Sequence, residues 1–105
     1  MTVPDPEFRS VARAADIPPG TVTAVQLDGE DIALANVDGK FFATQGHCLH
    51  LHGPLGEGRL EGPVLSCPWH GWQYDVRTGE NEFDLAIQLA TFEVKVEDGE
   101  VKIAL

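Results

Sequence analysis

Basic residues are scarce in this chain of 105 residues: seven lysines and arginines stand against seventeen acids, for a formal net charge of −10. Phosphate backbones and anionic lipid surfaces repel a protein this acidic, so we expect neither nucleic acids nor membranes as partners. The acidity suits two other roles, which are solubility and electrostatic steering toward a basic protein partner.

Long hydrophobic runs are also lacking, since no window approaches the roughly 18–20 apolar residues that cross a bilayer. The first seven residues have no basic start followed by an apolar stretch, so we expect no signal peptide and a cytoplasmic protein. Cysteine occurs only twice, as Cys48 and Cys67. In a reducing cytosol, this pair is better suited to bind a metal as thiolates than to form a disulfide.

The remaining pattern predicts an all-β fold, a small antiparallel sandwich or barrel in one domain over residues 1–105. Three Asp-Gly pairs separate β-rich segments and favour tight hairpin turns. Phe83–Ala90 is the most helix-tolerant segment, but it is short. We expect strands at Phe8–Ala14, Thr21–Leu27, Asp31–Val37, Lys40–Thr44, Val64–Ser66 and Trp72–Tyr74, and a C-terminal hairpin in which Phe92, Val94 and Val96 face Val101 and Ile103 across Asp98-Gly99.

The middle of the chain, at about residues 45–80, breaks this alternation and holds most of the glycines and all four histidines. Within this loop-rich subdomain lie two short elements, Cys48-Leu49-His50 and Cys67-Pro68-Trp69-His70, with sixteen residues between them. Long loops on a rigid scaffold are common places for functional sites. Two such elements can meet around a metal, each giving one sulfur and one nitrogen.

Three interpretations of this pattern compete. The first is a structural zinc site with two Cys and two His ligands. Common zinc knuckles pair Cys with Cys, whereas each element here carries one Cys and one His. The second is coincidence, which is disfavoured because both cysteines lie beside histidines in the glycine-rich part. The third is a two-iron, two-sulfide cluster with the cysteines on one iron and the histidines on the other.

The spacing Cys-x-His, sixteen residues, Cys-x-x-His resembles the signature of the Rieske iron–sulfur family. The run from Cys67 to Asp75 and the Thr78-Gly79 pair are similar to the second cluster loop of Rieske non-haem oxygenase systems. The resemblance implies a Rieske fold and one Rieske-type 2Fe–2S cluster. It also implies the metal ligands: Cys48 and Cys67 on the inner iron, His50 and His70 on the outer iron.

Departures from the respiratory Rieske proteins narrow the expected function. Gly53 and Trp69 stand where those proteins carry two bridging cysteines, and Trp72 stands where they carry a sulfide-bonding serine. These features and the acidic charge favour a reduction potential in the lower part of the Rieske range, near about −150 mV. All four histidines lie in the cluster region, so we expect no separate catalytic iron.

The chain therefore resembles a Rieske-type ferredoxin, the electron-transfer component of a multicomponent aromatic-ring dioxygenase and not an enzyme itself. The resemblance implies a monomer that passes electrons from an NAD(P)H-dependent flavoprotein reductase to a terminal ring-hydroxylating oxygenase. Two alternatives stay open. One is the small Rieske subunit of assimilatory nitrite reductase, and the other is a zinc-stabilised β binding module.

Residues around the proposed ligands have expected roles as well. His47 and His52 are expected as partly exposed neighbours of the cluster and not as ligands. Gly53 and Pro68 shape the two loops, and Trp69 either covers the cluster or serves as an exposed docking aromatic. Trp72 and Tyr74 alternate on a strand and suit the core, and by resemblance the Tyr74 hydroxyl reaches a cysteine sulfur.

Overall fold

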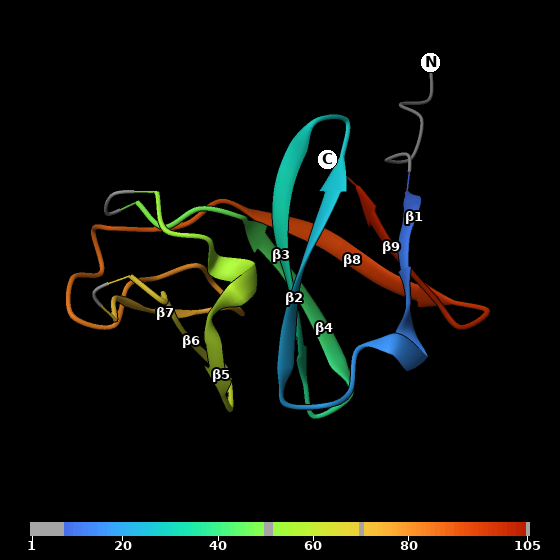
Figure 1. Cartoon of the computed structure of the whole chain (residues 1–105), viewed down its shortest axis with the longest axis horizontal. Coiled ribbons are helices and arrows are strands. Elements are labelled where there is room, and N and C mark those ends of the chain that lie inside the picture. The colour runs from blue at the N-terminus through green and yellow to red at the C-terminus, as the bar shows by residue number, and fades with distance from the viewer. Residues whose placement is uncertain (1–7, 50–51, 70, 105) are drawn as a thin grey trace, which may run out of the picture.

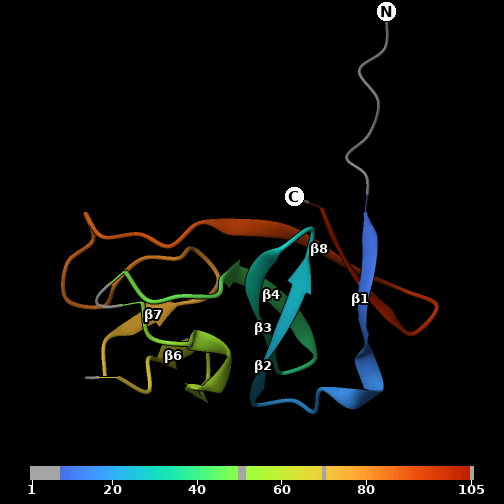
Figure 2. The same cartoon turned by 45° about the horizontal axis from the view of Figure 1, so that its top comes forward.

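The computed structural model describes residues 8–49, 52–69 and 71–104, which form two antiparallel sheets (Figures 1 and 2). The larger sheet has six strands in the order β1-β9-β8-β4-β3-β2, and the smaller has the order β5-β6-β7. The strands are β1 (Arg9–Arg13), β2 (Thr21–Leu27), β3 (Glu30–Val37), β4 (Lys40–Gln45), β5 (Arg59–Glu61), β6 (Val64–Ser66), β7 (Gln73–Asp75), β8 (Thr91–Glu97) and β9 (Glu100–Ala104), and the short 3₁₀ helices are η1 (Ala14–Asp16) and η2 (Leu55–Glu57).

The three expected Asp-Gly turns close hairpins in the larger sheet. Both residues of each turn have positive φ, as the two-residue turns that match the twist of a hairpin require. The angles are 54° and 78° at Asp28-Gly29, 51° and 92° at Asp38-Gly39, and 53° and 78° at Asp98-Gly99. The predicted all-β class, the β2–β4 meander and the C-terminal β8–β9 hairpin are confirmed.

Strands β5 and β7 differ from the sequence expectation. Strand β5 was not expected, because three residues are too few to show an alternation, and β7 begins at Gln73, one residue later than predicted. The short segment Phe83–Ala90, which is only helix-tolerant in sequence, forms no helix, in keeping with the expected all-β class. The backbone pairs across the segment instead: the N–H of Asn81 donates to the carbonyl of Ile87, and the N–H of Leu89 donates to the carbonyl of Gly79, so these groups are not available to a helix.

Strand β3 separates two hydrophobic cores, since its consecutive side chains point to opposite faces. Ile32 and Leu34 pack into the core enclosed by the six-stranded sheet. Ala33 and Ala35 pack into a second core, which lies against the smaller sheet and contains both cysteines. The small side chains on this second face leave room for η2, which packs against β2 and β3, so the first cysteine loop is supported by a strand buried on both sides.

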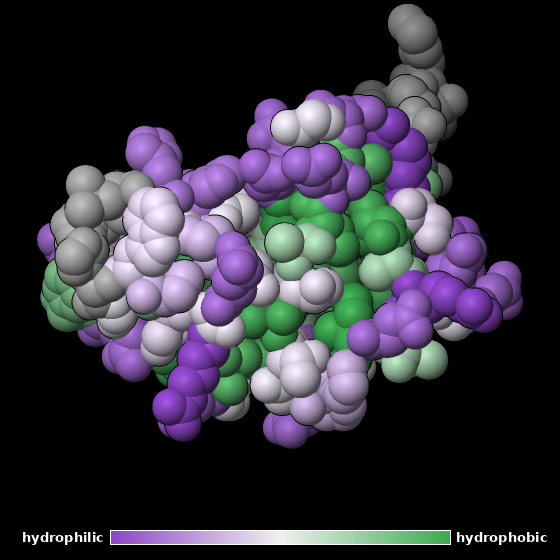
Figure 3. All heavy atoms as spheres, in the orientation of Figure 1, coloured by the Kyte–Doolittle hydropathy of each residue, from purple (hydrophilic) through white to green (hydrophobic). Residues whose placement is uncertain are grey.

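The larger sheet is nearly closed, with β1 and β2 as its two edges. An ion pair between Arg9 and Asp28 joins the β1 edge to the turn after β2. Hydrophobic residues gather on the face between β1 and β2 (Figure 3). None of the helices in the described part of the chain is long and apolar enough to cross a membrane.

Candidate metal centre

The two cysteines open two loops that are closed in the same way. The backbone N–H of Cys48 donates to the carbonyl of Gly53, and the N–H of Cys67 donates to the carbonyl of Trp72, each at 2.8 Å. Each loop therefore returns to its starting cysteine after five residues. The loops lie at the end of the molecule opposite the β8–β9 turn (Figures 1 and 2). The predicted ligands His50 and His70 belong to these loops in the sequence and lie outside the described residues.

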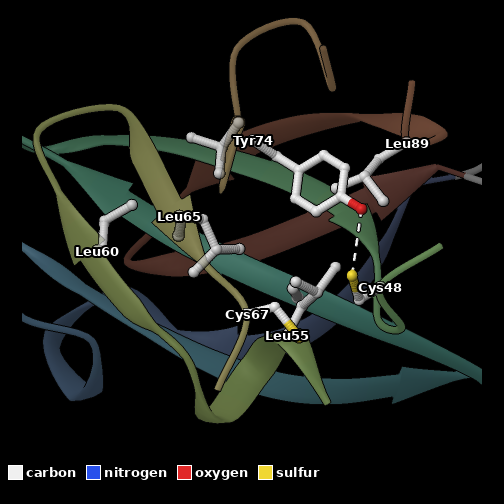
Figure 4. Close-up of a cluster of buried hydrophobic side chains, with 10 residues drawn as sticks. Cys48, Leu55, Leu60, Leu65, Cys67, Tyr74 and Leu89 are labelled. Atoms are coloured by element: carbon white, nitrogen blue, oxygen red, sulfur yellow. Dashed lines mark hydrogen bonds between the residues drawn. The ribbon is translucent and has the colours of Figure 1, made fainter. Parts of the chain in front are cut away.

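Both cysteine side chains are buried, at 0% exposure for Cys48 and 2% for Cys67, and neither forms a disulfide. They lie among apolar side chains of the second core, with Leu55 and Leu65 close by (Figure 4). The hydroxyl of Tyr74 is 3.1 Å from the Sγ atom of Cys48. The expectation that Tyr74 is a core residue whose hydroxyl reaches a cysteine sulfur is therefore confirmed.

The surroundings of the Cys67 thiol and the Tyr74 phenol oppose their ionisation in the absence of a cation. Burial raises the pKa of the Cys67 thiol, and the neighbouring Cys48 side chain raises it further, while the backbone N–H of Trp69 lowers it. Burial also raises the pKa of Tyr74, with a further contribution from Cys48. Because the thiolate is the form that binds a metal, ligation must displace the thiol proton, whereas Tyr74 keeps its own, and the positive charge of bound iron offsets the cost of burying the thiolate.

Gly53 leaves the space that the second sulfur occupies. A Cβ atom at this position would lie 2.4 Å from the Sγ atom of Cys67 and 3.2 Å from the Cβ of Trp69. No side chain larger than glycine therefore fits between the two loops without moving the sulfur. This close approach of the first loop to the second cysteine is the feature that brings the two halves of the motif together.

The described residues thus fit a cluster held partly by cysteine. Two neighbouring sulfurs lie in an apolar enclosure, where one faces a phenol hydroxyl and the other a backbone N–H. Within residues 8–49, 52–69 and 71–104, no group of three or more His, Cys, Asp or Glu side chains could hold a metal. The full four-residue ligand set therefore remains a prediction.

The flanking histidines and tryptophans lie at the surface of the centre. His47 is 3.6 Å from the Asp31 carboxylate, and its ring meets that of His52 edge-on with 6.5 Å between centroids. Both are at least partly exposed, as expected. Trp69 is 49% exposed, which favours the docking role over that of a buried cover. Trp72 is half-buried and packs edge-on against Phe83 at 5.1 Å, so it lies at the margin of the core.

Comparison with known proteins decides the family. Residues 7–93 match the family described as the Rieske [2Fe-2S] domain. The chain belongs to the Rieske family. The predicted cofactor, a Rieske-type 2Fe–2S cluster, is confirmed with it, which favours iron over the zinc alternative. The two buried sulfurs are the part of the described structure that suits this cluster.

Relatives of similar length narrow the family to its ferredoxins. Ferredoxin CarAc of Metapseudomonas resinovorans is 38% identical over 90% of each chain. The ferredoxin component of biphenyl 2,3-dioxygenase from Rhodococcus jostii is 36% identical, also over 90% of each chain. The ferredoxin of carbazole 1,9a-dioxygenase from Nocardioides aromaticivorans superimposes with a TM-score of 0.86 at 25% identity, covering 92% of this chain and 96% of that one.

These names bear out the expectation of a Rieske ferredoxin that carries electrons and is not the catalytic component. The small subunit of a nitrite reductase also shares the fold, with a TM-score of 0.81. At 21% identity, that likeness concerns the fold alone.

One residue of the centre escaped the sequence reasoning. Asn81 is fully buried next to Tyr74, with which it forms an isolated antiparallel bridge. The only signal in the sequence is an asparagine two residues before an aromatic, a combination typical of many exposed turns. Burial and the pairing with Tyr74 depend on tertiary contacts that no local pattern encodes.

Proposed function

We propose that this ferredoxin accepts one electron at a time from an NAD(P)H-dependent flavoprotein reductase and passes it to a terminal ring-hydroxylating oxygenase. The observation that carries the proposal is its likeness to a chain in the solved complex of reduced oxygenase and oxidised ferredoxin in carbazole 1,9a-dioxygenase. The identity is 37%, the TM-score is 0.84, and the match covers 92% of each chain.

The proposed ligands are Cys48 and Cys67 on one iron and His50 and His70 on the other. When bound, a Rieske cluster supplies a one-electron couple, at about −150 to +300 mV across the family. The chain contributes an apolar enclosure around the two sulfurs and a phenol hydroxyl beside Cys48. Donation from that hydroxyl to the sulfur stabilises the added negative charge of the reduced state.

Exposed apolar and acidic side chains near the centre support docking of partner proteins. Leu49 and Trp69 are exposed on the two cysteine loops. Phe83, which touches Trp72, is exposed between the acidic residues Glu82 and Asp84. An apolar contact area with acids at its margin suits a partner whose own contact area is ringed by lysine and arginine. The net charge of −10 would steer such a partner from a distance.

The test is reconstitution with a purified flavoprotein reductase and terminal oxygenase of a carbazole, naphthalene or biphenyl dioxygenase system. Stopped-flow absorbance should show reduction by the reductase in the presence of NADH or NADPH, and reoxidation by the oxygenase. The rate constants should fall as ionic strength rises, because salt screens charges beyond about 10 Å at 0.1 M. Electron transfer only to a nitrite reductase, or to none of these oxygenases, would contradict the proposal.

Two further properties belong to the same proposal. The midpoint potential should lie near about −150 mV, and voltammetry giving a value well above zero would contradict the ferredoxin assignment. The protein is also proposed to be a monomer and to be cytoplasmic, since its two cysteines form no disulfide. Size-exclusion chromatography of the brown holoprotein tests the monomer.

A further inference from the structure

Asn81 holds the segment that follows β7 in place. Its Oδ1 atom accepts hydrogen bonds from the backbone N–H groups of Phe83 at 3.0 Å and Asp84 at 3.1 Å. Its own backbone N–H donates to the carbonyl of Ile87 at 2.9 Å. The acceptor side of the amide is therefore fully used in shaping a turn.

The donor side of the same amide is not used. Among the described residues, the Nδ2 atom of Asn81 is buried without a hydrogen-bond partner, in a residue that is 0% exposed. A buried amide donor with no acceptor is costly, and such exceptions call for an explanation. The backbone bridge places Asn81 opposite Tyr74, whose hydroxyl lies 3.1 Å from the Sγ atom of Cys48.

We propose that Asn81 is a positioning residue for the cluster: in the holoprotein its unpartnered amide donates to the Tyr74 oxygen and so strengthens the hydrogen bond from Tyr74 to Cys48. A hydroxyl that accepts one hydrogen bond becomes a better donor in the next, and a low-dielectric interior increases this effect. A stronger donor at the Cys48 sulfur favours the reduced state. Asn81 therefore raises the reduction potential without touching the cluster's ligands. The inference rests on the proposed role of Cys48 as an iron ligand.

Asn36 provides a matched control in the larger sheet. It is also a buried asparagine whose Oδ1 caps a turn, accepting the N–H of Gly39 at 2.7 Å. Its Nδ2, however, donates to the carbonyl of Ile17 at 2.7 Å and has no role near the cysteines. Asn36→Ala therefore removes a comparable structural amide but no donor to Tyr74.

The experiment is voltammetry on the isolated holoprotein in four variants: Asn81→Ala, Asn36→Ala, Tyr74→Phe and the double variant Tyr74→Phe/Asn81→Ala. Asn81→Ala should make the one-electron reduction equilibrium about threefold less favourable, which is a fall of about 30 mV at 59 mV per tenfold. Asn36→Ala should lower the melting temperature but leave the potential unchanged. In the Tyr74→Phe background, removing the Asn81 amide should produce no further fall.

An equal fall in both backgrounds would overturn the proposal, because the amide would then act through packing and not through the phenol. A fall in Asn36→Ala as large as in Asn81→Ala would overturn it as well. Should Asn81→Ala fail to fold, Asn81→Ser keeps an oxygen acceptor for the turn, but its hydroxyl ends one bond short of the amide nitrogen, so this variant must still show the fall. These potentials need no reductase or oxygenase, so their outcome is separate from that of the proposed electron-transfer chain.

Discussion

The six-stranded sheet and the cysteine-bearing unit, made of the smaller sheet and its two loops, keep their shape by different means. In the larger sheet, β2 and β3 pair over seven consecutive residues and β3 and β4 over six, so backbone ladders and an alternating apolar face suffice. In the smaller sheet, each strand has three residues, and two members of the adjoining core are Cys48 and Cys67. The smaller unit therefore depends on its site for cohesion, whereas the larger sheet does not.

Loss of a cysteine should have the largest effect, and we expect it to be confined to the smaller unit. Cys67→Ser removes a thiolate that is buried at the junction of the two loops. Since metal binding and loop folding are coupled, we expect colourless protein with a poorly folded smaller unit. Visible absorbance, together with backbone NMR signals from both regions, would show whether the larger sheet keeps its ladders. His70→Ala is predicted to behave in the same way.

The matched control is His52→Ala, in an exposed residue of the first loop. This variant, like His47→Ala, should keep the cluster and its visible spectrum. A normal cluster spectrum in Cys67→Ser or His70→Ala would contradict the ligand assignment.

Truncation of one core leucine in each region should have the next largest effect. Leu34 lies in the core of the larger sheet and Leu65 in the core beside the cysteines, and both are fully buried. Each change to alanine should lower the free energy of unfolding by about 2–5 kcal/mol, the range for cavities in well-packed cores. Leu65→Ala should also shorten the lifetime of the cluster against a chelator, measured as loss of visible absorbance. Faster cluster loss in Leu34→Ala than in Leu65→Ala would contradict the separation of the two cores.

The same contrast explains how far the sequence predicts the structure. The strands of the larger sheet follow from alternation and from Asp-Gly turns, both of which are local signals, and β2 was predicted to the residue. The Cys-x-His and Cys-x-x-His spacing identified the family, because ligand chemistry restricts that pattern tightly. Strand β5 was missed because it is too short to show a period, and the burial of Asn81 opposite Tyr74 was missed because it depends on tertiary contacts.

Substitution of one glycine in each region should lower the free energy of unfolding by less than truncation of a core leucine does. Gly53→Ala places a Cβ atom 2.4 Å from the Cys67 sulfur. The packed loops cannot relieve this clash without moving the sulfur. Overpacking of this kind lowers stability by about 1–3 kcal/mol, and here it should also reduce iron content. Gly29→Ala meets nothing within 4 Å but has φ of +78°, so only backbone strain of about 1 kcal/mol is expected.

Iron content per chain and urea unfolding of the holoprotein distinguish these two effects. Gly29→Ala should bind iron normally and unfold at slightly lower urea. Full iron loading in Gly53→Ala, with an unchanged visible spectrum, would mean that the two loops have more room around Cys67 than the geometry implies.

The smallest effects concern an aspartate–arginine pair in each region. Hydrogen bonds from Arg77 hold the pKa of Asp75 on β7 below its usual range, and those from Arg9 do the same for Asp28 in the larger sheet. A lowered pKa in the folded state stabilises the protein above the unfolded value of about 3.9, and this contribution disappears as the pH falls through the folded value. The side chain of Asp75 is 19% exposed and that of Asp28 is 56% exposed, so solvent screens the second pair more.

We therefore expect Asp75→Asn to lower the melting temperature at pH 7 more than Asp28→Asn does. Both differences from the unmodified protein should shrink below about pH 4, and salt should reduce the effect of Asp28→Asn first. Asp75 also accepts the backbone N–H of Arg77 at 2.9 Å, at the start of the turn that leads to Asn81, so its loss loosens the smaller unit locally. Equal effects of the two substitutions would show that the smaller sheet relies on its surface charges no more than the larger one does. Effects that grow toward acid would contradict the stabilisation by ionised carboxylates.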